Sequence, residues 1–486
     1  MSYTRKVAYN TAAQMIGKVV GTAISFVTVA ILFRYFGIDG IGKYTTVFAF
    51  VGFFGVLADF GLQWTLIREL AVDEDKQKVF SNIFAFRLLS AIVVYALCFA
   101  AVWFFNYPYD VKLGVGIIAI ATFFATMNSA LVSVYLNNYR LDITVSAEVV
   151  GRAITLGLIY LVVKGSGGFD LAMTAYIGGN VIIFLINLYL LDRFIKFGMA
   201  FNLKYWRHVL TQAIPIGIIM VFGFIYYKID SVMLSLMKGM TDIGIYGTAY
   251  KMLEILQTIP VMFLGAAFPL ITRYATTGDE RVRPAFQKSF DFLILLAVPL
   301  VILFFFLAEP IIHFIAGAKG NEFVSESTVS FLGHAITSVT TMKILIFSVG
   351  INFVSNLYTY MILSLGRQKS VIWPTLGFAV FNLALNFLLI PRFSYLGAAV
   401  ATLLTEIIVC TTYVILTNKF LALPIKLHGA LKLFAAGVLM AALTYSLDRA
   451  GLNMFAIIAI TLVFYSGLVF LFKAIPMELV RTLIKK

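Results

Sequence analysis

Cysteine, histidine and charged residues are all scarce in this sequence. The two cysteines, Cys98 and Cys410, fall in apolar runs of a 486-residue chain, so the sequence supports neither a disulfide framework nor a cysteine metal site. The four histidines are scattered, with no pair three or four residues apart, which argues against a helical pair of metal ligands. Charged residues make up 12% of the chain, against roughly a quarter in soluble domains, so a soluble protein is excluded.

Long apolar runs dominate what is present, since 61% of the residues are hydrophobic and 46 are Phe. A helix crosses a bilayer with roughly 20 apolar residues, so we expect an all-α polytopic membrane protein of about 14 transmembrane helices, the first of them retained rather than cleaved as a signal peptide. The expected spans lie near residues 11–33, 43–66, 79–105, 112–136, 142–163, 170–191, 210–236, 243–269, 286–308, 340–364, 370–390, 396–417, 429–447 and 452–474.

The net charge of +14 comes from 37 Lys and Arg that are spread along the chain and form no basic face, so we expect no nucleic-acid partner. When the spans alternate in direction, 23 of the 37 fall on one membrane face and eight on the other. Positive residues resist translocation, so the first face is the inner one. The sequence therefore predicts an even number of crossings of the cytoplasmic (plasma) membrane, with both termini in the cytoplasm.

Two short segments indicate an internal repeat. GIDGIGKY at 37–44 and GMTDIGIY at 239–246 share four of eight residues at an offset of 202, although Gly-rich turns can also match by chance. The repeat predicts two six-helix bundles related by a pseudo-twofold axis along the membrane normal, with two extra C-terminal helices. The expected domains are a lobe at 1–194, a cytoplasmic linker at 195–209, a lobe at 210–418, and the extra helices with a cytoplasmic tail at 419–486.

Ionisable residues inside the predicted spans are the candidate functional residues. An ionisable group at bilayer depth costs at least about 2.5–3.5 kcal/mol, so it normally faces a cavity or a partner. Glu148 and Arg152 lie four residues apart, and Lys251 and Glu254 three apart, so each pair shares a helix face and can neutralise itself. For both pairs, structural pairing and a functional role stay open.

The other candidates have no simple partner in the sequence. Lys228 and Asp230 are two residues apart and point in different directions. Four more stand isolated within their spans: Lys18, Asp59, Arg87 and Glu406. An ion pair between helices, from Asp59 to Arg87 or to Lys18, is the structural alternative to a functional role. Asp59, Asp230 and Glu406 are also candidates to bind a coupling proton or sodium ion, which the membrane potential would help to drive.

The segment YYKIDSVMLSLMKGMTDIGIYGTAYKMLEILQTIPVMFLGAAFPLITRYA at 226–275 resembles the seventh and eighth helices of the polysaccharide transporter family of lipid-linked oligosaccharide flippases. That family lies within the multidrug/oligosaccharidyl-lipid/polysaccharide exporter superfamily. Similar segments in the same order span nearly the whole chain: the opening run NTAAQMIGKVVGTAISFVTVAILFRYFG, ADFGLQ, LSLGRQKS and SYLGAAVATLLTE.

The resemblance implies two bundles around a central cavity that opens alternately to either side of the membrane. It makes Lys18, Arg152 and Lys251 the leading candidate contacts for a pyrophosphate headgroup, and Lys228 and Arg87 the next candidates. The acids become candidates for ion coupling or structural pairing: Asp59, Glu148, Asp230, Glu254 and Glu406.

We therefore expect a flippase for cell-surface polysaccharide biosynthesis, which moves a polyprenyl-pyrophosphate-linked oligosaccharide from the cytoplasmic to the outer leaflet without a cofactor. Its expected partners are this substrate, membrane lipids and other polysaccharide assembly proteins, and we expect a monomer. The alternatives are a drug or organic-cation antiporter of the sister family and a peptidoglycan lipid precursor flippase. An integral-membrane glycosyltransferase or ligase is disfavoured, because the longest outer connection, 309–339, offers few catalytic groups.

Overall fold

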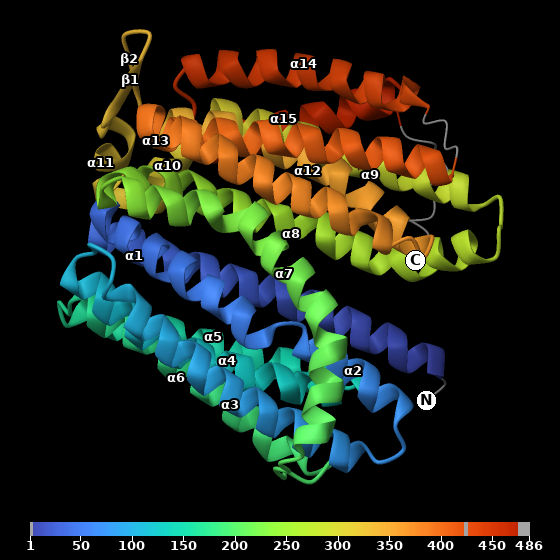
Figure 1. The fold of residues 1–486 in the computed structure, drawn as a ribbon. Coiled ribbons are helices and arrows are strands. Elements are labelled where there is room, and N and C mark those ends of the chain that lie inside the picture. The colour runs from blue at the N-terminus through green and yellow to red at the C-terminus, as the bar shows by residue number, and fades with distance from the viewer. Residues whose placement is uncertain (1–2, 422–425, 475–486) are drawn as a thin grey trace. The chain divides into compact units, whose positions relative to one another are not determined.

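The computed structural model describes residues 3–421 and 426–474, and the predicted cytoplasmic tail lies outside them (Figure 1). Helices account for 86% of the described residues, so the predicted all-α class is confirmed. The chain divides into two compact units, Met1–Gly244 and Ile245–Lys486. The lobe and linker boundaries drawn from the sequence stay a prediction.

The first unit is a bundle in which α4 packs against α6, α5 against α1 and α6, and α7 against α1 and α2. The start of α8 also belongs to it. Its helices are α1 (Tyr3–Asp59), α2 (Leu62–Val72), α3 (Lys76–Val102), α4 (Tyr109–Asn137), α5 (Leu141–Lys164), α6 (Phe169–Leu191) and α7 (Leu203–Met237), and α8 (Met240–Thr276) begins in it and continues in the second unit.

In the second unit, α9 packs against α12 and α14, and α12 packs against α13. A short hairpin, β1–β2, projects beside these helices (Figure 1). After α8, the elements are α9 (Val282–Phe306), α10 (Ala308–Ala316), η1 (Gly317–Lys319), α11 (Gly320–Ser325), β1 (Val329–Phe331), β2 (His334–Ile336), α12 (Ser338–Ser364), α13 (Lys369–Phe420), α14 (Leu427–Arg449) and α15 (Met454–Leu471).

Two of the helices are too long for one crossing. At 1.5 Å per residue, the 57 residues of α1 would span about 86 Å if straight, against roughly 30 Å of hydrocarbon. Instead α1 bends at Gly37, whose φ of 69° is relaxed only for glycine, and the 52-residue α13 bends at Ser394, with a φ of 46°. Among the described residues, twelve helices are long and apolar enough to cross a membrane. Counting the two bent helices as pairs gives the fourteen predicted crossings.

The two predicted repeat segments meet within the first unit. A Cβ added to Gly42 would lie 1.9 Å from the Met240 carbonyl oxygen, and one added to Gly244 would lie 2.1 Å from the Ile38 carbonyl oxygen. Gly42 corresponds to Gly244, and Ile38 to Met240, at the offset of 202. The same backbone contact is therefore made twice, once in each direction. This reciprocity supports the internal repeat and explains why both positions are glycine.

The 309–339 connection, in which the sequence analysis predicts no element, is folded. A hydroxyl at Tyr395, next to the bend of α13, donates to the Ile336 carbonyl oxygen at 2.5 Å and accepts from the Thr328 amide at 3.3 Å. The hairpin turns at Leu332 and Gly333, both with positive φ, as a two-residue type I′ turn requires. The connection is thereby fastened to the bend of α13.

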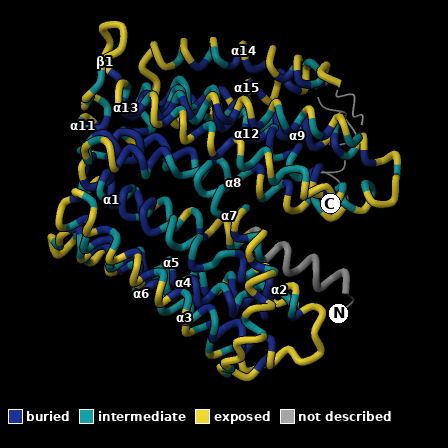
Figure 2. Tube along the Cα trace, viewed as in Figure 1, coloured by how far each residue is buried: buried dark blue, intermediate teal, exposed yellow. Residues whose placement is uncertain are grey.

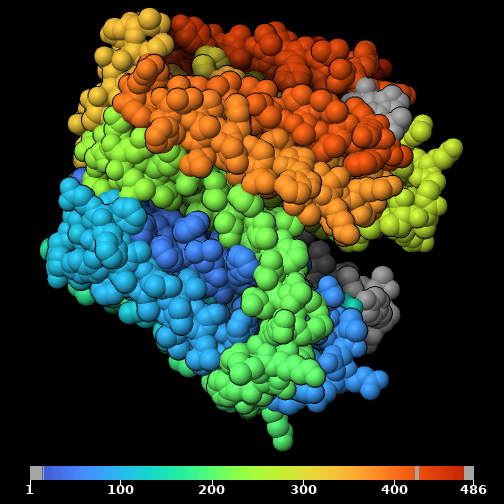
Figure 3. Space-filling view, in the orientation of Figure 1, coloured from blue at the N-terminus to red at the C-terminus, as the bar shows by residue number. Residues whose placement is uncertain are grey.

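Burial follows the pattern of a membrane protein. Buried residues run along the inner faces of the helices in each unit (Figure 2), while large apolar side chains stay exposed on the outer faces. On α13, which lies across the visible face of the second unit (Figure 3), Trp373, Phe387 and Leu388 are all more than half exposed. Such apolar surface is stable where lipid, rather than water, surrounds the helices.

Candidate functional site

Arg152, a leading headgroup candidate, lies on α5 and packs against Gly21 of α1. The absent side chain of Gly21 leaves room for it, because a Cβ there would come within 3.3–3.5 Å of the Arg152 side chain. The guanidinium donates to the Ser25 hydroxyl at 3.1 Å and lies 3.7 Å from the Glu148 carboxylate. Its side chain is nevertheless 40% exposed. Arg152 is thus held in place while several of its five N–H donors remain available to an anion.

Lys18 lies on the same side of α1 as this guanidinium. It precedes Gly21 by three residues, and residues three or four apart share a helix face. Its side chain is exposed. The neighbouring Gly17 packs on Val145 of α5, so Lys18 stands at the edge of the α1–α5 contact rather than inside it. Lys18 and Arg152 together form what we call the α1–α5 cation pair.

Arg87 and Asp59 form the interhelix ion pair that the sequence analysis considered. The pair joins α3 to the end of α1, where Phe60 and Gly61 with positive φ separate α1 from α2. Arg87 is 1% exposed and Asp59 13%. Nε and Nη1 of Arg87 and Oδ2 of Asp59 have no hydrogen-bond partner among the described residues. In this arrangement Arg87 neutralises Asp59 and is closed to a bulky headgroup.

Lys228 and Asp230, both on α7, differ in exposure. Asp230 is 3% exposed, and its carboxylate accepts the Ser231 backbone amide at 2.7 Å. Lys228 is half-buried. The two side chains therefore have distinct surroundings, as their two-residue spacing predicts.

In the second unit, Lys251 and Glu254 form the expected pair within α8. Their charged groups lie 3.1 Å apart, and the side chains are 30% and 24% exposed. Pairing lowers the cost of placing both charges in a membrane span. A headgroup role for Lys251 would therefore require it to share its charge between Glu254 and the substrate.

Glu406 is a buried acid with polar neighbours on two helices. It is 5% exposed on α13 and accepts hydrogen bonds from Ser355 at 2.5 Å and Asn352 at 3.2 Å, both on α12. The next residue, Thr405, accepts from Asn382 at 3.0 Å, and Asn386 in turn bonds to Asn382. These residues form one buried polar strip along α12 and both halves of α13.

Sequence reasoning found Glu406 but missed the amides and hydroxyls around it. The signal was available, because Asn352 and Asn356 lie four residues apart in an apolar span, as do Asn382 and Asn386. Amide pairs at this spacing face one side of a helix, and buried amides need partners.

Comparison with known families identifies two related groups. The family model described as "Polysaccharide biosynthesis protein" matches residues 4–275, and the MatE model matches residues 215–388. The first match covers more than half of the chain and includes the α1–α5 cation pair.

Two curated proteins are similar over most of their length. A "Putative O-antigen transporter" of Shigella flexneri is 21% identical over 406 residues, which cover 81% of this chain and 93% of the relative. A "Probable low-salt glycan biosynthesis flippase Agl15" of Haloferax volcanii is 22% identical over 398 residues, which cover 80% of this chain and 79% of the relative.

Solved structures share the fold at lower identity. A structure described as "Lipid II flippase MurJ, inward closed conformation" aligns with a TM-score of 0.76 at 15% identity, covering 97% of this chain and 99% of the other. An inward-facing multidrug resistance MATE family transporter of the MOP superfamily aligns with a TM-score of 0.62 at 10% identity, covering 84% and 98%. The predicted superfamily resemblance is confirmed.

Proposed function

Because the chain belongs to the polysaccharide biosynthesis protein family, we propose that it is a flippase for a polyprenyl-pyrophosphate-linked oligosaccharide, which it moves from the cytoplasmic to the outer leaflet. The observation that carries this proposal is the family match over residues 4–275. The two curated relatives, named a transporter and a flippase, add to it. The chain is a multi-pass membrane transporter rather than an enzyme. Its place in the plasma membrane, with both termini in the cytoplasm, is part of the proposal.

The geometry of the α1–α5 cation pair supports a headgroup role. A pyrophosphate needs several cationic donors, and Arg can bond two of its oxygens at once. Arg152 is anchored by Ser25 yet 40% exposed, so binding would require little rearrangement of its side chain. Lys18 adds a second exposed cation on the same side of α1. Lys251 is proposed as a third contact from the second unit.

Reconstituted vesicles test the proposal. The full chain is placed in liposomes with a fluorescent polyprenyl-pyrophosphate-linked oligosaccharide, and its exposure on the opposite leaflet is followed by a membrane-impermeant quencher. We expect the parent to move the lipid. We expect Arg152→Ala to slow movement about tenfold or more, because hydrogen bonds to charged groups contribute about 1.5–3 kcal/mol.

Matched variants separate the site from a general loss of charge. Lys18→Ala and Lys251→Ala are expected to slow movement, whereas Lys343→Ala is expected to leave it unchanged. Lys343 also lies in a span, but its ammonium stacks on the Phe305 ring, with 5.5 Å between the nitrogen and the ring centroid. Normal movement by Arg152→Ala, Lys18→Ala and Lys251→Ala alike would reject the site.

A drug or organic-cation antiporter is the second candidate, favoured by the MatE match at 215–388. Such a substrate would need unpaired carboxylates and aromatic faces. The exposed groups of the α1–α5 contact are instead two cations against one acid, Glu148, which already lies beside Arg152. Uptake of a fluorescent organic cation by the same vesicles, with no movement of the glycolipid, would establish this alternative.

Energy coupling is proposed to use a proton, a sodium ion or the membrane potential. Glu406 is the leading acid for this role, because its polar strip supplies carboxylate, amide and hydroxyl oxygens in one buried place. Oxygen ligands of this kind suit small hard cations. Asp59 and Asp230 are the other candidates, and Asp59 is already paired with Arg87.

A further inference from the structure

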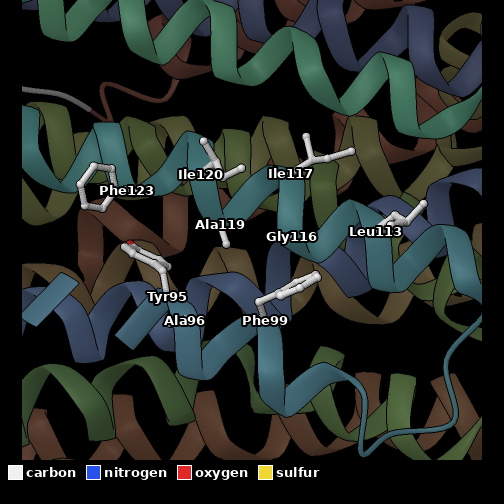
Figure 4. A pocket seen from close by; sticks show the side chains of 9 residues that line it. All are labelled: Tyr95, Ala96, Phe99, Leu113, Gly116, Ile117, Ala119, Ile120 and Phe123. Atoms are coloured by element: carbon white, nitrogen blue, oxygen red, sulfur yellow. The ribbon is translucent and has the colours of Figure 1, made fainter. Parts of the chain in front are cut away.

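An apolar groove opens between α3 and α4 on the first unit, and none of the residues that line it is a candidate site residue (Figure 4). Tyr95 and Phe99 from α3 form one wall, and the segment of α4 from Gly116 to Phe123 forms the other. Gly116 leaves space for the Phe99 ring, since a Cβ there would lie 2.8 Å from it. The groove has a volume of about 470 Å³, in the range of roughly 300–1,000 Å³ typical of ligand sites.

The bottom of the groove offers a ligand almost nothing polar. Tyr95 carries a hydroxyl, but this hydroxyl bonds to the Thr126 hydroxyl at 2.8 Å and is buried. Phe99 and Ile120 remain about half exposed at the opening. The groove therefore suits a hydrocarbon chain and would exclude a sugar or an ion.

The mouth of the groove, at the α3–α4 turn, has different chemistry. Trp103 follows Phe99 by one helical turn, with 6.2 Å between ring centroids, and Tyr109 packs edge-to-face against Trp103 with 6.3 Å between centroids. Lys112 places its ammonium nitrogen 5.2 Å from the centroid of the Trp103 ring. Trp, Tyr and Lys in this arrangement are typical of the depth at which lipid headgroups lie.

The Lys112 ammonium is available to bind an anionic group. Among the described residues no carboxylate forms an ion pair with it, and its contact is with the Trp103 ring. The nearest acid in the sequence, Asp110, lies 2.7 Å from Lys43 and is engaged there. Lys112 also precedes Gly116 by four residues, so it stands directly above the groove on the same face of α4.

We propose that α3 and α4 bind an anionic phospholipid of the surrounding bilayer, with one acyl chain in the groove and the phosphate on Lys112. The apolar walls of the groove suit the acyl chain of the lipid, and the Lys112 ammonium at its mouth suits the negatively charged phosphate. The α3–α4 turn lies on the predicted outer face, so this lipid belongs to the outer leaflet. The residues that line this groove are distinct from the proposed headgroup contacts.

Native mass spectrometry of the delipidated full chain in detergent tests this site with defined lipids. Dioleoyl-phosphatidylglycerol is expected to bind the parent more tightly than dioleoyl-phosphatidylcholine. Lys112→Gln should weaken phosphatidylglycerol binding about fivefold and leave phosphatidylcholine unchanged, as expected for one Lys near an anionic headgroup. Lys112→Arg should retain the preference. Ala96→Phe, which fills the groove from its α3 side, should weaken both lipids.

Matched controls lie elsewhere on the first unit. Lys164→Gln removes an exposed cation from the end of α5 on the same predicted face, and Ala153→Phe enlarges an exposed position on α5. Both should bind lipids like the parent, and thermal unfolding without lipid checks that every variant is folded. Equal binding of the two phospholipids by the parent would overturn the proposal. Parent-like binding by Lys112→Gln and Ala96→Phe, or preferential binding of polyprenyl phosphate over phosphatidylglycerol, would overturn it as well.

Discussion

The reciprocal glycine contact in the first unit leads to a quantitative prediction for Gly42→Ala. The new methyl group would lie 1.9 Å from the Met240 carbonyl oxygen and 2.8 Å from its carbon. Both are backbone atoms, so no side-chain rotation can relieve the clash. Overpacking typically costs about 1–3 kcal/mol, and a backbone clash belongs at the upper end. Alanine regains up to about 1 kcal/mol of helix propensity. We expect a net loss of about 2 kcal/mol.

Gly244→Ala should behave in the same way, because its Cβ would lie 2.1 Å from the Ile38 carbonyl oxygen. The two substitutions push apart the same two segments. Once one has separated them, the second meets less resistance, so the double variant should lose less stability than the two single losses combined. A double-mutant cycle therefore measures whether the two glycine contacts are energetically coupled.

Thermal unfolding of the detergent-purified full chain is the assay, with Gly223→Ala as the matched control. Gly223 lies within α7 and a Cβ there would have nothing within 4 Å, so alanine should raise the unfolding midpoint slightly. We expect Gly42→Ala and Gly244→Ala to lower it. A midpoint for Gly42→Ala equal to that of the control, or fully additive losses in the double variant, would refute the reasoning.

Three further predictions rest on single contacts. Arg87→Met should destabilise the chain by about 3–5 kcal/mol, because it leaves a buried charge on Asp59, and adding Asp59→Leu should recover much of the loss in the same unfolding assay. Tyr395→Phe should cost about 1 kcal/mol through the lost bond to Ile336, and it should speed proteolysis of the hairpin. Glu406→Gln should abolish any stimulation of lipid movement by an imposed pH or sodium gradient. Unchanged stimulation would exclude Glu406 as the coupling acid.

Most of the fold could be predicted from apolar run length, since each expected span overlaps a helix of the structure. The span expected at 112–136 is α4, Tyr109–Asn137, and that expected at 142–163 is α5, Leu141–Lys164. Hydropathy works this well because a membrane leaves no alternative to helix for an isolated apolar segment. The connection at 309–339 escaped prediction, because its hairpin depends on Tyr395, more than fifty residues away in the sequence.

The candidate site was predictable as a set of residues but only partly as an arrangement. Pairs within one helix, such as Lys251 with Glu254, followed from spacing alone. The pair between Arg87 and Asp59 could only be offered as one of two alternatives, since spacing says nothing about which helices meet. The anchoring of Arg152 could not be predicted from spacing either, because it depends on a glycine in another helix.

Arg152 and Arg87 show how exposure decides the role of a charge in a membrane span. Each is an arginine in an apolar helix, and each lies beside one acid. Arg87 is 1% exposed, so its charge is committed to Asp59 and its loss should appear as instability. Arg152 is 40% exposed and bonded to Ser25, so its loss should appear in substrate movement while the fold survives. If Arg152→Ala unfolded as readily as Arg87→Met, the guanidinium would be a packing element, and the headgroup site would have to be sought elsewhere.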